Sequence, residues 1–206
     1  MDSALVILIV VAIALAVIVL GPLRQGQQRE ERWGALAEAL GLQLQSGGLQ
    51  GELQGLSVRM GMEMHTVGGE GLIQFCVVRA KAPGPLPRGF VAAPRRWTSG
   101  LSRRLADNLF ASGDPALDEM YLFQSDEQDK GQAFVEDAQV QQALRGVLGS
   151  GQVAFVEKGW VGIASVGLIT ETEEARRKFE AVVRSAQSLA DSQERRSLAQ
   201  PRATEE

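Results

Sequence analysis

The chain has 206 residues, a formal net charge of -4 and a single cysteine. An acidic balance gives no global reason to expect a nucleic-acid partner, and one cysteine, Cys76, excludes an intramolecular disulfide framework and a cysteine-pair metal site. Without its apolar N-terminal run, the chain is long enough for one ordinary domain with a sizeable core, or for two small ones.

An apolar run dominates the start of the chain. Residues 4–20 contain no polar side chain, and the apolar character continues to Leu23. A helix over residues 4–23 would be about 30 Å long, which matches the hydrocarbon core of a bilayer. The run lacks the preceding positive charge of a signal peptide and the polar side of a surface helix. We therefore expect a transmembrane anchor at residues 1–23.

Charges beside the run indicate its orientation. Arg24, Arg29 and Arg32 follow it, and the only charged side chain before it is Asp2. Positive residues stay on the cytoplasmic side of a membrane, and acidic residues count for little. We expect the N-terminus outside and the remaining chain in the cytoplasm. A periplasmic envelope component with the reversed topology is the alternative.

A helical pattern follows the anchor. Apolar residues recur at spacings of three and four from Trp33 to Leu40, which predicts a helix over residues 27–40 that Gly41 is placed to end. We assign residues 24–32 to a juxtamembrane linker and the start of this helix.

The pattern then changes to alternation. A short strand is expected over residues 49–55, and apolar residues alternate with polar ones over residues 56–65, where the methionines point inward. Residues 72–80 return as the partner strand after a glycine-rich turn. These segments predict a three-stranded antiparallel meander.

The centre of the chain is irregular and basic. Three prolines within residues 83–89 exclude an interior strand or helix there, and residues 90–93 suit a short edge strand. A cationic cluster around one tryptophan is a candidate contact with anionic lipid, at about 1 kcal/mol per charge near the membrane surface. Its residues are Arg88, Arg95, Arg96, Trp97, Arg103 and Arg104. A solvated charged loop is the alternative.

A capped turn leads into the last third. Asp114 suits an N-cap and Pro115 the first position of a short helical turn, and residues 120–124 suit a strand.

The last third carries clear periodicity. We expect a helix over residues 136–148, a hairpin over residues 153–168 and a closing helix over residues 170–190. Residues 191–206 lack periodicity and are predicted to be a disordered tail. The elements together predict an α+β domain over residues 33–190, with a mainly antiparallel sheet and packed helices.

No residue pattern carries recognisable chemistry. His65 lies on the polar side of its strand, and Cys76 lies inside a strand without a readable partner, so structural roles are favoured for both. Residues 126–137 imitate a calcium loop, but a lysine occupies one ligand position. Asp114 and Asp118 are the carboxylates that an unrecognised enzyme would use as acid and base. We predict no catalytic, cofactor or metal site.

Short motifs resemble a group of uncharacterised bacterial proteins, many from myxobacteria-like lineages. The motifs are Trp33-Gly34-Ala35-Leu36-Ala37 and Gly113-Asp114-Pro115-Ala116-Leu117-Asp118. The second is similar to the Gly-Asp-Pro-Ala-Phe-Asp motif of that membrane-anchored group, with Leu117 in place of the phenylalanine. The resemblance implies a fold shared with that group and supplies no activity or cofactor. The location expected from the anchor is the bacterial inner (cytoplasmic) membrane, with the soluble domain in the cytoplasm.

The combined prediction is a single-pass membrane protein held by residues 4–23, whose cytoplasmic domain binds or scaffolds a partner without performing chemistry. Two alternatives remain open: an enzyme using carboxylates near Asp114 and Asp118, and the periplasmic envelope component.

Overall fold

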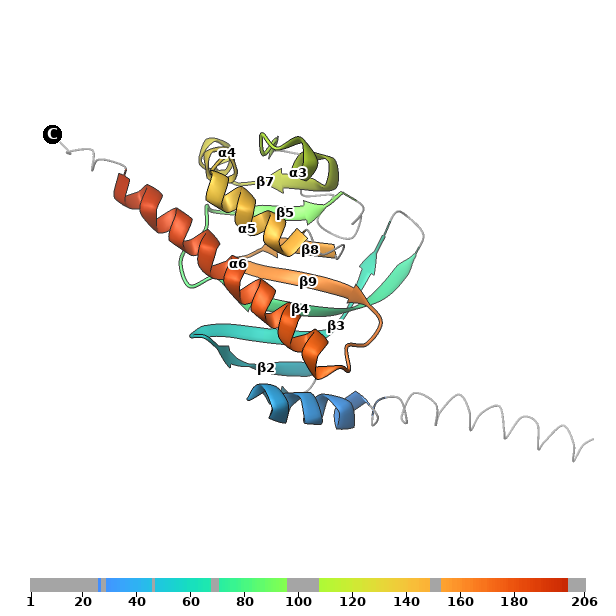
Figure 1. The fold of residues 1–206 in the computed structure, drawn as a ribbon. Helices are drawn as coiled ribbons and strands as arrows, with labels where there is room; N and C mark the ends of the chain where they lie inside the picture. Colours follow the sequence, from blue (N-terminus) through green and yellow to red (C-terminus); the bar gives the residue numbers. More distant parts are fainter. Residues whose placement is uncertain are drawn as a thin grey trace, which may run out of the picture.

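The computed structural model describes residues 26, 29–45, 47–67, 71–95, 108–148 and 153–199. Within these ranges, nine strands form one antiparallel sheet, and the helices pack against one of its two faces (Figure 1). We call this the helix face and the opposite side the open face. The chain is therefore α+β with a large antiparallel sheet.

The sheet joins segments that are distant in the sequence. The strands are β1 (Gln43–Gln45), β2 (Gly48–Leu53), β3 (Leu56–Thr66), β4 (Leu72–Lys81), β5 (Val91–Pro94), β6 (Leu109–Phe110), β7 (Tyr121–Gln124), β8 (Val153–Glu157) and β9 (Trp160–Val166). The helices are residues 29–40, α3 (Pro115–Met120), α4 (Gln128–Val135), α5 (Ala138–Leu148) and α6 (Thr172–Ala199). The strand order is β1-β2-β3-β4-β9-β8-β5-β7-β6, so β4 lies beside β9.

Helix α6 supplies the stripe that closes the core. Its residues Phe179, Val182, Val183, Ala186 and Leu189 recur at spacings of three and four, and each is at most 1% exposed. They pack against α5 and the helix face of β4 and β9 (Figure 1). Full burial of one large apolar side chain stabilises the fold by about 1.5–3 kcal/mol, so this helix contributes much of the core.

Trp33 fastens the N-terminal helix to the rest of the domain. Its side chain is buried, and its indole Nε1 donates a hydrogen bond of 3.1 Å to the carbonyl of Ile169, which precedes α6. The guanidinium of Arg29 lies 5.6 Å from the ring centroid. The apolar stripe predicted for this helix is therefore a packing surface, which joins the two ends of the described domain.

Asp114 caps α3 and ties it to α5. Its Oδ1 accepts a 3.0 Å hydrogen bond from the amide of Ala116, and its Oδ2 accepts a 2.8 Å bond from Nε of Arg145. Burial raises the pKa of Asp114, but the bonds from Arg145 and the helix amides outweigh it and hold the pKa below its usual range. The N-cap predicted for this residue is confirmed.

The transmembrane part of the predicted fold class is wrong for the structure described. No helix within the described ranges is both long enough and apolar enough to span a membrane, and the predicted span, residues 4–23, lies outside those ranges. The 28-residue α6 has the length, but charged side chains along it exclude a span. The membrane and single-pass descriptions therefore have no support in the described residues.

One further expectation is corrected. The segment predicted as an edge strand is β5, which lies inside the sheet between β8 and β7 because its small residues Ala92 and Ala93 fit a fully buried position. The segment that imitates a calcium loop contains α4, whose Phe134 and Val135 are buried in the core. No cluster of metal-ligating side chains occurs among the described residues.

The closing helix is longer than predicted. It continues from residue 190 to Ala199, into the segment expected to be disordered. The side chains of this extension find local partners, since Ser192 donates to the carbonyl of Ser188 at 2.9 Å and Arg195 donates to Gln139 of α5. The predicted meander, by contrast, is confirmed as β2, β3 and β4, and the predicted hairpin as β8 and β9.

Replacing Trp33 with phenylalanine tests the attachment of the N-terminal helix. We expect Trp33→Phe to lower the free energy of unfolding by about 1–3 kcal/mol, because the buried carbonyl of Ile169 loses its donor. Chemical denaturation of Trp160→Phe, at a half-buried tryptophan, is the matched control and should show a smaller loss. Equal losses would contradict the assigned role.

The lowered pKa of Asp114 predicts a pH-dependent contribution to stability. A carboxyl whose folded pKa lies below its unfolded value stabilises the fold above the unfolded pKa, and this gain is lost as pH falls through the folded pKa. The free energy of unfolding of wild type should therefore exceed that of Asp114→Asn by about 1–3 kcal/mol at neutral pH. This difference in stability should become smaller below about pH 4. Chemical denaturation of Arg145→Gln should show the same loss of the stability difference from wild type at low pH. A constant gap would show that the ion pair is not its source.

Candidate binding surface

The open face presents a set of polar and aromatic side chains that the helices leave uncovered. Alternation along each strand, combined with the register between strands, places these residues on one side. They are Gln43, Gln45, Gln50, Arg59, Glu63, His65, Arg79, Lys81 and Trp160. A small apolar cluster of Phe75, Val77, Phe155 and Ala164 supports them, and no described helix contributes to it.

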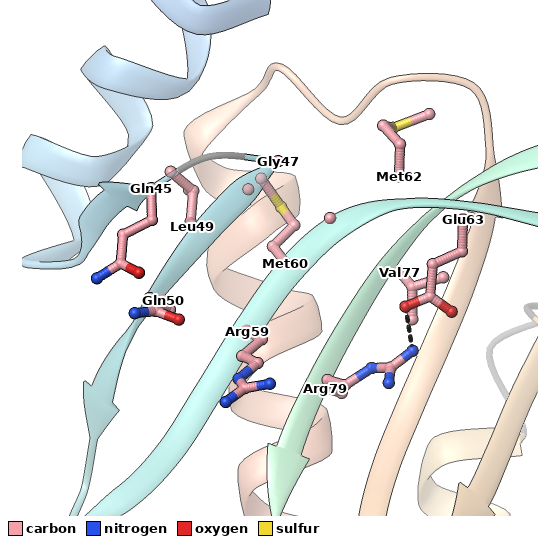
Figure 2. Close-up of a pocket in the computed structure, with 12 residues that line it drawn as sticks. Gln45, Gly47, Leu49, Gln50, Arg59, Met60, Met62, Glu63, Val77 and Arg79 are labelled. Carbon is pink, nitrogen blue, oxygen red and sulfur yellow. Dashed lines mark hydrogen bonds and ion pairs between the residues drawn. The ribbon is translucent and has the colours of Figure 1, made fainter.

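Glu63 links two neighbours on this face. Arg79 donates a hydrogen bond to Glu63 from the adjacent strand, and Nε2 of His65 lies 3.3 Å from the other carboxylate oxygen (Figure 2 shows the Arg79 contact). Partial burial raises the pKa of Glu63, but His65 and Arg79 outweigh it and hold the pKa below its usual range. The charge of Arg79 is therefore already matched within the domain.

Trp160 lies beneath two other cations. The guanidinium of Arg59 is 5.0 Å from the indole centroid, and Nζ of Lys81 is 5.5 Å from it. Lys81 also donates a 2.7 Å hydrogen bond to the carbonyl of Lys158. Each stacking contact is worth about 0.5–1 kcal/mol at an exposed site. The ring therefore holds both cations in place without neutralising either.

No carboxylate of the described residues lies within ion-pairing distance of Arg59 or Lys81. Glu157 is on the same face, but Lys158 pairs with it at 3.1 Å. Glu52, on the neighbouring strand, lines the same surface hollow as Arg59, but the two side chains form no ion pair. Two cations on a domain of net negative charge are thus available to an external anion.

A trough of about 290 Å³ lies beside Arg59. Its floor is formed by Gly48, Gly61 and Val77, which face one another across β2, β3 and β4. The polar side chains that border it are Gln45, Gln50, Arg59, Arg79 and Glu63. Figure 2 shows Gln45, Gln50 and Arg59 projecting to the same side of β2 and β3. The trough therefore combines two amides with one unmatched guanidinium.

A second polar hollow, of about 390 Å³, lies between α5 and α6. It includes the cations Arg184 and Arg195 together with the carboxylate of Asp191. Arg195 is held by Gln139 and Ser192. The hollow contains no aromatic side chain, and its carboxylate weakens the attraction for an anion. We therefore favour the open face.

The basic stretch predicted to contact lipid is only partly described. Arg88 is 3.6 Å from Asp126, and Nε of Arg95 donates a 2.7 Å bond to the carbonyl of Asp118. The other predicted contacts, Arg96, Trp97, Arg103 and Arg104, lie outside the described residues. Both described arginines have partners within the domain, and the lipid contact stays a prediction.

The candidate catalytic carboxylates are occupied by structural contacts. Asp114 caps α3 and pairs with Arg145, while Oδ1 of Asp118 accepts a 2.7 Å bond from the amide of Ser112. Burial raises the pKa of Cys76 to about 11, which keeps its thiol protonated at neutral pH.

Among the residues that the open face brings together, the sequence singled out His65, for which a structural role was favoured. The alternation of Arg59, Glu63 and His65 placed them on the polar side of one strand, which is confirmed. The approach of Trp160 to Arg59 depends on β9 pairing with β4, which no local pattern signals.

No protein-family model matches the chain, and no curated protein matches it either. Among solved structures, the chain is similar to the crystal structure of the mycobacterial trehalose monomycolate transport factor A, TtfA. The TM-score is 0.49 at 10% sequence identity, over 79% of this chain and 93% of that one. Similarity at this level carries no inference about a ligand or partner, and the resemblance in the motif at residues 113–118 stays a prediction.

Proposed function

We propose that this domain acts by binding rather than by chemistry, and that its open face binds an acidic segment of a partner protein. The observation that carries the proposal is the pair of unmatched cations, Arg59 and Lys81, held over Trp160. Because stacking on Trp160 already orders both side chains, they lose less conformational entropy when a partner binds.

The chemistry of the face favours carboxylates. Arg59 presents a planar fork of donors that suits a carboxylate, and Lys81 adds a point charge beside it. Aromatic and arginine side chains are the residue types that most often dominate binding energy at protein interfaces. Trp160 and Arg59 therefore form the centre of this interface, with the glutamines at its margin.

Competing functions have weaker support. A nucleic-acid partner would contact many phosphates, whereas this face offers two unmatched cations on a chain of net charge -4. An enzyme built on Asp114 and Asp118 would have to free both carboxylates from contacts that hold α3. The binding proposal holds for either cellular location, and a cytoplasmic domain stays a prediction.

Charge reversal on the open face tests the proposal. The full chain is titrated with a fluorescein-labelled peptide of eight glutamates, and binding is followed by anisotropy. We expect Arg59→Glu with Lys81→Glu to weaken binding by about tenfold or more, because attraction is replaced by repulsion. Arg176→Glu with Arg177→Glu, at two exposed arginines of α6, makes the same change in net charge; it is the matched control and should bind nearly as wild type does.

Three outcomes would contradict the proposal. Wild type could fail to bind the peptide, or the control could lose as much affinity as Arg59→Glu with Lys81→Glu. The third is tighter binding of a single-stranded oligonucleotide or an anionic vesicle through the same two residues, which would assign the face to a different partner class.

A further inference from the structure

We infer that the trough beside Arg59 is a peptide subsite, in which an extended segment of the acidic partner crosses the strands and places one carboxylate side chain against Arg59. The inference rests on the binding function proposed above and specifies how the partner lies.

Glycines create the depth of this subsite. Gly48 and Gly61 are direct partners in the β2–β3 register, on the open face. A Cβ atom on Gly48 would lie 2.0 Å from the carbonyl oxygen of Met60, so only glycine fits there, and one on Gly61 would lie 3.3 Å from the carbonyl of Gly47. The two strands therefore approach without side chains between them, and peptide backbone forms the floor.

The size of the trough suits part of a chain. Its volume of about 290 Å³ lies just below the range of about 300–1,000 Å³ found for small-ligand pockets. It begins near Gln45 on the edge strand β1, so a longer ligand can enter from the edge of the sheet. An extended peptide meets both conditions, because one or two of its residues fill the trough while the rest continues outside.

Hydrogen-bonding groups along the trough match a peptide. The side-chain amides of Gln45 and Gln50 each offer donors and an acceptor, which is the combination that a peptide backbone needs. Arg59 pairs with Gln50 across β2 and β3, so a carboxylate at its guanidinium would lie beside that amide. Val77 gives the far end of the floor an apolar surface.

One anion fits better than several. Arg79 is already bound to Glu63, and the carboxylate of Glu63 borders the trough on the side away from Arg59. A second negative charge placed in the trough would meet Glu63 at short range, where like charges repel. The subsite therefore admits one carboxylate, at Arg59, and the other carboxylates of an acidic segment lie outside the trough.

Variants of the trough separate this inference from the general function. The full chain is titrated with a labelled octapeptide that carries one glutamate among serines and alanines, and with the eight-glutamate peptide. We expect Gln45→Ala with Gln50→Ala to weaken binding of both peptides by about tenfold, the factor that one or two hydrogen bonds supply. Gln128→Ala, at an exposed glutamine of α4 away from the open face, is the control and should bind as wild type does.

A second variant adds a methyl group to the floor of the trough. Gly61→Ala, with its folding checked by thermal melting, should also reduce binding, because the added methyl group occupies the trough. If the glutamine pair and Gly61→Ala both bind as wild type does while Arg59→Glu with Lys81→Glu binds weakly, the subsite is wrong and the general function stands. If wild type binds neither peptide, both are overturned.

Discussion

Helix α6 packs against one face of the sheet, and this packing determines which side chains remain on the other face. Because side chains alternate along a strand, burying Cys76 and Val78 beneath α6 forces Phe75, Val77 and Arg79 to the other side. A slip of one residue in register would exchange the two sets. The composition of the open face is therefore a direct consequence of how the core closes.

The same constraint accounts for the positions of the functional groups. Pairing of β4 with β9 brings the turn after β8 against Lys81 and lays Trp160 beneath two cations from different strands. Pairing of β2 with β3 places Gly48 opposite Gly61 and opens the trough next to Arg59. An open face with ion pairs at one side and unmatched cations at the other is suited to selecting a partner by charge and shape.

Local patterns in the sequence anticipated local structure. Alternation over residues 56–65 predicts β3, and apolar spacings of three and four predict α6. Both predictions succeed because these elements are determined by residues that are close together in the chain. The position of β5 inside the sheet was missed because it depends on strands far away in the sequence. For the same reason no sequence signal linked Arg59 to Trp160, and the predicted contact surface was the basic stretch around Arg88.

A map of backbone amide NMR shifts, recorded on the full chain as the eight-glutamate peptide is added, would locate the binding surface. Binding at the open face predicts that the largest shifts fall on β2, β3, β4 and β9, with Gln50, Gly61 and Trp160 among them. Shifts centred on Arg184 and Arg195, in the hollow between α5 and α6, would contradict it and move the binding surface to the helix side.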